Sequence, residues 1–253
     1  MSEFKNKTIL ITGGARGLGF GIASAFAHEG ANLVLTDIIQ DTLETAKKNL
    51  IEKYKIKVLT VKADGGNEAA VKSAIDQTMQ EFGSLHALVN NAQASKSGLP
   101  FIEHSKEDFD LAIYSGLYAT FFYMKYAFPY LKESKGSIIN MASSAGMYGR
   151  PGQTSYAAAK EGIRALSRVA ATEWGEYGIN VNIVCPLAMT EALAKWKQEY
   201  PDAYAENIKN IPMKRFADPQ EDIGRVCVFL ASSAANYISG ETIAVQGGSG
   251  LRP

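Results

Sequence analysis

Tyr156 and Lys160 are the two residues whose types and spacing could perform chemistry. The pattern predicts a helix over residues 156–171, and positions four apart lie on one face of a helix. A phenol ordinarily has a pKa of about 10, and a neighbouring ammonium lowers that value. Ser143, shortly before them, could donate a hydrogen bond to a substrate oxygen. Together the three side chains suit proton transfer to or from an alcohol or a carbonyl.

An isolated Tyr-x-x-x-Lys pair is more often an ordinary pair on a helix surface, so its surroundings must support the prediction. Residues 137–142 form the short apolar run that is typical of a buried strand. A loop rich in glycine and proline follows and leads into the predicted helix. The three side chains are therefore expected where a strand ends and a helix begins.

The N-terminal segment predicts a dinucleotide site. A strand over residues 8–12 leads into a loop with Gly13, Gly14, Gly17 and Gly19. A helical pattern then covers residues 18–29, and a second strand over 32–36 ends at Asp37. Such glycines let the backbone approach a pyrophosphate on the helix N-terminus, and an acid about 20 residues later accepts from the adenosine ribose.

Two charged residues bear on the choice between NAD and NADP. The carboxylate of Asp37 would repel a 2′-phosphate, which favours NAD. Arg16 in the glycine loop could pair with that phosphate, although it could equally be a solvated loop residue. We weight Asp37 more heavily, because it lies where the 2′ position is expected.

Further strands are expected over residues 57–62, 85–90 and 242–245, and helices over 106–132 and 221–231. Asp64 could accept from an adenine amino group or cap the helix that begins near Glu68. Asn91 either contacts a ligand or ties neighbouring strands together. The aromatic residues of the helix over 106–132 are expected in the core and in a subunit interface.

The chain length and the alternation of predicted strands and helices indicate one α/β domain, residues 1–253, with a doubly wound parallel sheet. Lysine and arginine together balance aspartate and glutamate at 26 each, so no global field favours nucleic acid or a membrane. Cys185 and Cys227 have no metal-ligand spacing and are expected as core residues in a reducing cytoplasm. No metal site, signal peptide or membrane span is predicted.

Over nearly its whole length the chain resembles the classical short-chain dehydrogenases/reductases. The matching residues are Thr12-Gly13-x-x-x-Gly17-x-Gly19, Asp64, Asn90-Asn91-Ala92, Ser143, Tyr156-x-x-x-Lys160, Pro186 and Thr190. The resemblance implies that Tyr156 is the general acid/base, that Lys160 lowers its pKa and holds the nicotinamide ribose, and that Ser143 orients the carbonyl. It also implies a homotetramer.

The resemblance assigns two sets of ligand contacts. The cofactor is expected at Gly13, Arg16, Gly17, Leu18, Gly19, Asp37, Asp64, Gly65, Asn91, Tyr156, Lys160, Pro186, Ala188 and Thr190. The substrate is expected at Gln93, Ser143 and Tyr156.

Three residues depart from the family pattern. Gln93 follows Asn-Asn-Ala where the family usually has glycine, and Leu187 follows Pro186 where glycine is also usual. Gly116 aligns with the asparagine that in the family binds a proton-relaying water. A glycine inside a helix costs roughly 1 kcal/mol relative to alanine. We therefore expect Gly116 to admit a water or to ease a bend.

In these departures the chain resembles one subgroup of the family, the bacterial 12α-hydroxysteroid dehydrogenases, which act on bile acids. The shared segments include NNAQAS, CPLAMT and GGSGLRP. The members of that subgroup that we can place favour NADP, which conflicts with Asp37.

Residues 190–216 are expected to form a mobile helical lid over the substrate. Their apolar side could cover a flat hydrophobic molecule, and their basic residues, Lys195 among them, could meet a carboxylate tail. An ordinary pair of amphipathic surface helices would give the same pattern.

The sequence thus predicts an NAD(P)-dependent oxidoreductase that interconverts a secondary alcohol and a ketone, with the 12α-hydroxyl of bile acids as the preferred substrate. One alternative is a reductase of the same family that acts on 3-oxoacyl thioesters or small polyols. The other is a non-catalytic dinucleotide-binding sensor.

Overall fold

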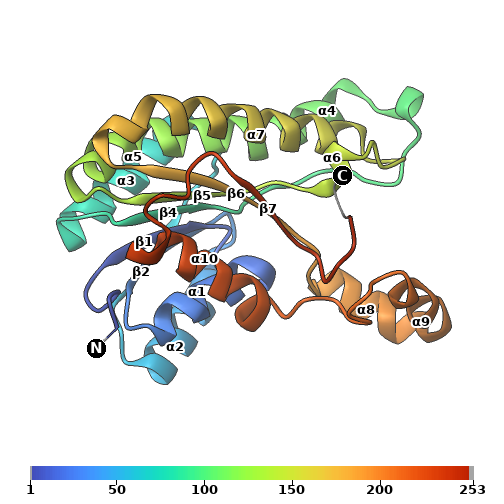
Figure 1. Ribbon diagram of the computed structural model, residues 1–253, viewed down its shortest axis with the longest axis horizontal. Coiled ribbons are helices and arrows are strands. Elements are labelled where there is room, and N and C mark those ends of the chain that lie inside the picture. The colour runs from blue at the N-terminus through green and yellow to red at the C-terminus, as the bar shows by residue number, and fades with distance from the viewer. Residues whose placement is uncertain (1, 251–253) are drawn as a thin grey trace.

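A parallel sheet of seven strands organises the computed structural model, which describes residues 2–250 (Figure 1). The strands are β1 (Thr8–Thr12), β2 (Asn32–Asp37), β3 (Val58–Lys62), β4 (Ala87–Asn90), β5 (Ser137–Met141), β6 (Asn180–Pro186) and β7 (Thr242–Val245). Their order is β3-β2-β1-β4-β5-β6-β7, so the direction of winding reverses between β1 and β4. The predicted doubly wound α/β fold is confirmed. The end of the GGSGLRP segment, residues 251–253, lies outside the described residues.

Helices cover both faces of the sheet (Figure 1). One face carries α1 (Gly17–His28), α2 (Gln40–Tyr54) and α10 (Arg225–Ala231), and the other carries α3 (Glu68–Phe82), α5 (Ala119–Ser134) and α7 (Thr154–Trp174). The two layers explain why β1, β4 and β5 are buried at every position. Strands covered on both faces have continuous apolar runs instead of an alternating pattern.

The long helix expected over residues 106–132 is confirmed, although it is not α-helical throughout. It consists of α4 (Lys106–Ala112), the π-helical segment η2 (Ile113–Tyr118) and α5, which follow one another without a break. Gly116 lies inside η2. Of the aromatic residues expected in the core and in a subunit interface, Tyr123 is in the core, whereas Tyr114, Tyr118 and Phe121 are exposed.

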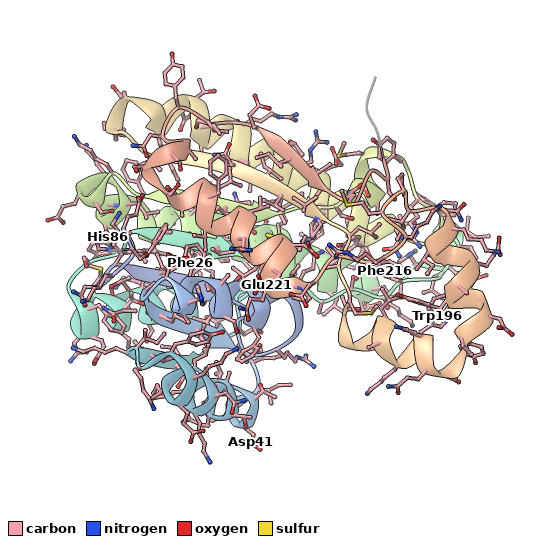
Figure 2. All side chains as sticks on the ribbon, turned by 60° about the horizontal axis from the view of Figure 1, so that its bottom comes forward. Phe26, Asp41, His86, Trp196, Phe216 and Glu221 are labelled. Atoms are coloured by element: carbon pink, nitrogen blue, oxygen red, sulfur yellow. The ribbon has the colours of Figure 1, made fainter. Side chains whose placement is uncertain are left out.

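Two helices, α8 (Glu191–Glu199) and α9 (Pro201–Lys209), project from the carboxyl edge of the sheet (Figure 1). Pro201 begins α9, as the break in the sequence pattern predicted. These helices share a small core of Tyr204, Ile211 and Phe216, against which Trp196 packs (Figure 2). The apolar face predicted for a substrate is therefore partly used within the lid itself.

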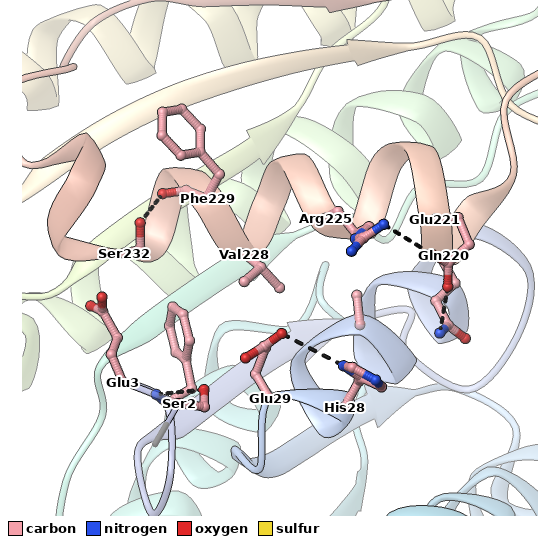
Figure 3. Close-up of a pocket in the computed structure, with 12 residues that line it drawn as sticks. Ser2, Glu3, His28, Glu29, Gln220, Glu221, Arg225, Val228, Phe229 and Ser232 are labelled. Carbon is pink, nitrogen blue, oxygen red and sulfur yellow. Dashed lines mark hydrogen bonds and ion pairs between the residues drawn. The ribbon is translucent and has the colours of Figure 1, made fainter.

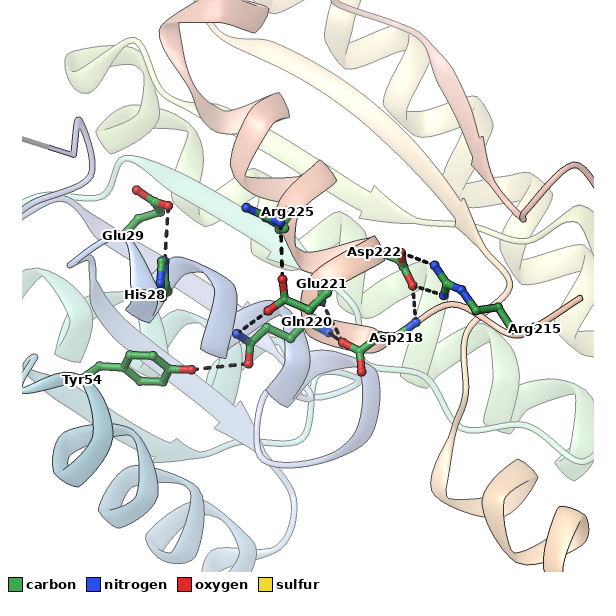
Figure 4. Close-up of polar contacts among 9 residues, drawn as sticks. All are labelled: His28, Glu29, Tyr54, Arg215, Asp218, Gln220, Glu221, Asp222 and Arg225. Atoms are coloured by element: carbon green, nitrogen blue, oxygen red, sulfur yellow. Dashed lines mark hydrogen bonds and ion pairs between the residues drawn. The ribbon is translucent and has the colours of Figure 1, made fainter. Parts of the chain in front are cut away.

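The chain that follows α9 is fixed to the body of the protein (Figure 4). Arg215 pairs with Asp222, and Nη2 lies 2.9 Å from Oδ1. Asp218 Oδ1 accepts from the backbone N–H groups of Gln220 and Glu221, at 2.8 Å each. The C-terminal end of the segment over residues 190–216 is thus anchored to the residues that lead into α10.

A hollow of about 380 Å³ lies between the N-terminal segment, α1 and α10 (Figure 3). Its polar groups are largely paired, since Glu3 accepts from Ser233 and Glu221 contacts Arg225. Cys185 and Cys227 are buried thiols, as predicted. Among residues 2–250, no helix is long and apolar enough to cross a membrane.

Candidate active site

A cavity of about 690 Å³ opens at the carboxyl edge of the sheet, where the winding reverses. This is the edge at which doubly wound sheets bind ligands. It brings together most of the cofactor residues predicted from the sequence, namely Gly13, Arg16, Gly17, Leu18, Gly19, Asp37, Asp64, Gly65, Asn91 and Thr190. Gln93 also lines it. Ser143, Tyr156, Lys160, Pro186 and Ala188 are not among its lining residues.

The glycine loop has the shape that a dinucleotide needs. A Cβ atom at Gly19 would lie 2.0 Å from the carbonyl oxygen of Gly13, so only glycine fits there. Gly17 has a positive φ of 53°, and a Cβ there would meet no atom within 4 Å. Helix α1 has no acidic residue in its first turn and no side-chain cap. Its N-terminal N–H groups and its dipole are therefore available to a phosphate.

Two acids, Asp37 at the end of β2 and Asp64 just after β3, line this cavity. Asp37 is only 9% exposed, and its Oδ1 accepts from the N–H of Ile38 at 2.8 Å and from that of Ile39 at 3.4 Å. Asp64 Oδ1 accepts from the N–H of Gly66 at 2.9 Å. The alternative that Asp64 caps the next helix is wrong, because Asn67 caps α3.

Asn91 ties neighbouring strands together, one of its two predicted roles. Its Nδ2 donates to the carbonyls of Thr12 and Gly13, at 3.0 and 3.2 Å. The hydroxyl of Thr12 accepts from the N–H groups of Asn91 and Ala92. These bonds hold the end of β4 against the glycine loop.

The serine, tyrosine and lysine lie beside this cavity, at the end of the adjacent strand β5. Ser143 caps the short helix α6 (Ser144–Met147), which sequence reasoning expected as loop, and its Oγ accepts from the N–H of Ala145 at 3.1 Å. The hydroxyl proton of Ser143 thus remains for donation. Lys160 is 4% exposed, and its Nζ donates to the carbonyl of Met141 at 2.7 Å and lies 5.6 Å from the ring centre of Tyr156.

Burial governs the protonation of both groups. Desolvation raises the pKa of Tyr156, and the hydrogen bond from Ser143 and the charge of Arg150 lower it less. The sequence-based expectation that Lys160 lowers the tyrosine pKa is not met, because burial is the largest influence on Tyr156 and raises its pKa. Desolvation instead lowers the pKa of Lys160 from 10.5 to about 8, so the ammonium is largely protonated at neutral pH and loses its charge as the pH rises past 8.

The lowered pKa of Lys160 implies that the stability of the folded protein depends on pH. Between pH 8 and pH 10.5 the unfolded chain holds a proton that the folded lysine has released. Stability contributed by this group therefore rises with pH across that window, by at most about 3 kcal/mol. In urea unfolding, the free energy of unfolding of the wild type should rise relative to that of Lys160→Met from pH 8 to 10.5. Below that range the difference between the two proteins should be constant. Parallel curves throughout would contradict the burial of a titrating lysine.

Gly116 and Gln93 form a matched pair. A Cβ at Gly116 would lie 2.6 Å from Oε1 and 3.0 Å from Nε2 of Gln93. The Gln93 amide thus occupies the room that a side chain at position 116 would fill. No group of the described chain hydrogen-bonds either amide atom, although both are buried. Gly116 lies in a π-helical segment, which agrees with its expected role in easing a bend.

Gly116→Asn should therefore destabilise the protein by about 1–3 kcal/mol, the range for an overpacked core. Adding Gln93→Gly should recover most of that loss, because it clears the space from the opposite side. Thermal or urea unfolding of both single variants and of the double variant measures the coupling. Additive effects of the two substitutions would show that the side chains do not compete for one space.

One residue of the lid lines this cavity although it was not among the predicted cofactor contacts. It is Lys195 of α8, one of the basic residues that could meet a carboxylate tail, and it lines the cavity together with Thr190. Ser115 and Tyr123 also line this cavity and were not predicted to do so. The only signal in the sequence was the spacing of Lys195, five residues after Thr190 on one helix. Within the described residues, no group of His, Cys, Asp and Glu could hold a metal ion.

The fold and the glycine-loop cavity define a dinucleotide-binding α/β protein. The chain belongs to the short-chain dehydrogenase/reductase family and is an oxidoreductase, and this family binds NAD(P). The family model described as enoyl-(acyl carrier protein) reductase matches residues 13–250.

Among curated proteins, the chain is 55% identical to a 12α-hydroxysteroid dehydrogenase of a Clostridium species, over the whole of both chains. It is 33% identical to a 3-oxoacyl-[acyl-carrier-protein] reductase of Chlamydia muridarum, over 96% of this chain and 97% of that one.

Two solved structures share the fold. Levodione reductase superposes with a TM-score of 0.91 at 33% identity, over 97% of this chain and 98% of the other. Xylitol dehydrogenase with bound NAD⁺ has a TM-score of 0.89 at 25% identity, over 97% of this chain and all of the other.

Proposed function

We propose that this protein oxidises the 12α-hydroxyl group of bile acids, and reduces the corresponding ketone, with a nicotinamide dinucleotide. The observation that carries the substrate assignment is the 55% identity, over the whole of both chains, to a 12α-hydroxysteroid dehydrogenase. The identity to the 3-oxoacyl reductase is much lower, at 33%. Oxidation of a bile acid yields a ketone, and the dinucleotide, when bound, accepts the hydride.

The side chains around Ser143 provide the proton chemistry. The hydroxyl of Ser143, whose oxygen is already engaged by the N–H of Ala145, donates to the substrate oxygen and orients it. Tyr156 takes the alcohol proton during oxidation and returns it to the carbonyl oxygen during reduction. Lys160 supplies positive charge behind the phenol and, through its bond to Met141, stays at the end of β5.

The residues that hold the dinucleotide are those that line the cavity. The N-terminus of α1 and the backbone at Gly17 accommodate the diphosphate, and Asp37 accepts from the adenosine ribose. Pro186, the last residue of β6, and Ala188 and Thr190 after it complete the nicotinamide end, although of these three only Thr190 lines the cavity. We propose NAD as the preferred cofactor, because the buried carboxylate of Asp37 opposes a 2′-phosphate.

Asp37→Ala should weaken NAD binding about 10-fold and strengthen NADP binding, with Arg16 left to pair with the added phosphate. Titration of each cofactor into the protein gives the ratio of the two dissociation constants. Asp41→Ala, an exposed acid at the start of α2, is the matched control and should leave that ratio unchanged. A stronger preference for NAD in Asp37→Ala would reverse the assignment.

We propose that residues 190–216 act as the substrate lid and that bile acids enter beneath it past Gln93. We also propose that the protein works in the cytoplasm as a homotetramer. A flat steroid suits the apolar residues that α8 and α9 contribute, such as Trp196 and Leu193.

Initial rates with deoxycholate and chenodeoxycholate test the substrate proposal, since of the two only deoxycholate carries a 12α-hydroxyl. Deoxycholate should be oxidised and chenodeoxycholate should not. Reduction of acetoacetyl thioester in preference to 12-oxo bile acids would favour the 3-oxoacyl alternative. Dinucleotide binding without turnover of any alcohol would favour the sensor.

A further inference from the structure

Lys195 stands out among the cations of the lid, because it faces the dinucleotide cavity and has no partner. It lies in α8 and lines the same cavity as Gly13, Arg16 and Gly17. No hydrogen bond, ion pair or aromatic contact joins Lys195 to another residue of the described chain. Its ammonium is therefore free to meet an anion within the cavity.

The other cations of this region are already engaged. Lys197 lies over the ring of Tyr204, 4.8 Å from its centre, and Lys209 pairs with Glu206. Lys214 donates to the carbonyl of Lys209 at 2.8 Å, and Arg215 pairs with Asp222. These contacts hold the lid together or anchor it. They leave Lys195 as the cation of the lid that is directed at the cofactor.

The part of the cavity opposite Lys195 is built for negative charge. Helix α1 presents uncapped N–H groups there, and Arg16 at its N-cap has no ion-pair partner among residues 2–250. Thr190 caps the N-terminus of α8, where its hydroxyl accepts from the N–H of Leu193 at 3.2 Å. The acids of the cavity, Asp37 and Asp64, lie at the adenosine end. An anion at the N-terminus of α1 would meet the positive potential of that helix, and Lys195 lines the same cavity.

We propose that Lys195 binds the diphosphate of the dinucleotide and thereby draws α8 of the lid toward the N-terminus of α1. This inference rests on the proposed dinucleotide site and adds a residue to it. One end of the lid is held by Arg215 and Asp222, and α8 carries the ammonium at the other end. A phosphate that binds both α1 and Lys195 shifts the lid toward closure by its preference for the closed arrangement.

The lid contains its own reporter, because Trp196 follows Lys195 directly and packs against Tyr204, with ring centres 6.2 Å apart. The chain has two tryptophans, and the other, Trp174, is partly buried and packs against Phe128 at the end of α7. A Trp174→Phe background therefore isolates the fluorescence of Trp196. In this background, ADP should change the fluorescence, whereas adenosine, which lacks the diphosphate, should not.

Lys195→Met should weaken ADP about 10-fold and remove the fluorescence change, and added salt should weaken ADP less in this variant. Lys197→Met, two residues along the same helix, is the matched control and should respond to ADP as its parent does. If Trp174→Phe does not fold, protection of the lid from trypsin by ADP gives the same comparison without that substitution.

Three results would overturn the proposal: an unchanged response to ADP in Lys195→Met, an equal response to adenosine, or an equal loss in Lys197→Met. A response to 2′,5′-ADP that exceeds the response to ADP would move the contact to the 2′-phosphate and would also overturn it. The titration uses no alcohol and no nicotinamide, so its failure is separate from any failure of the bile-acid assignment.

Discussion

Tyr156→Phe should lower kcat by about 10²- to 10⁴-fold, which is the usual contribution of a positioned acid or base. The substitution removes one oxygen atom from a ring that is held in α7 beside Lys160. Because the ring remains, binding of the dinucleotide should persist, and the loss should appear in kcat and not in the cofactor dissociation constant. Stopped assays at saturating cofactor, with cofactor titration alongside, separate the two quantities.

Tyr54→Phe is a suitable control for the loss of a phenol. Its hydroxyl contacts Gln220 at 3.4 Å on the side of the sheet that carries α2, away from the cavity (Figure 4). This variant should turn over at the rate of the wild type. If Tyr156→Phe kept wild-type turnover, another group would have to move the proton.

Gly19→Ala should weaken dinucleotide binding by about 10- to 100-fold. The added methyl group would lie 2.0 Å from the carbonyl oxygen of Gly13 and 2.7 Å from Nδ2 of Asn91, so the loop must shift. Overpacking of this kind costs about 1–3 kcal/mol, and the displaced atoms are those that face the phosphates. Calorimetric titration of NAD and a thermal unfolding curve together measure the effect.

Gly175→Ala provides the comparison, because a Cβ there would meet no atom within 4 Å and its φ of −57° is compatible with alanine. It should bind NAD as the wild type does. A Gly19→Ala protein with wild-type affinity would mean that the glycine loop does not receive the diphosphate.

The sheet and the dinucleotide cavity were predictable because each depends on local patterns. Apolar runs such as residues 8–12 are too short and continuous for anything but buried strands between glycine loops. The glycines that follow β1 have one common physical purpose, which is close backbone approach. Asp37 was predictable in the same way, because it is the last residue of β2 and so lies at the carboxyl edge of the sheet, as the glycine loop does.

The features that sequence reasoning missed depend on packing between distant segments. The close approach of Gln93 to Gly116 joins residues from two separate segments, and Gly116 lies in a π-helical turn that the sequence pattern did not predict. The direction of Lys195 depends on how α8 is set against α1. The raised pKa of Tyr156 follows from its burial, which the four-residue spacing to Lys160 does not reveal.

The identity of the product formed from cholate tests the central proposal most directly, because cholate carries hydroxyl groups at three ring positions. The protein is incubated with cholate and NAD or NADP, and the product is identified by nuclear magnetic resonance. The proposal predicts a single ketone at the 12 position. A ketone at either of the other positions, or unchanged cholate with both cofactors, would contradict it.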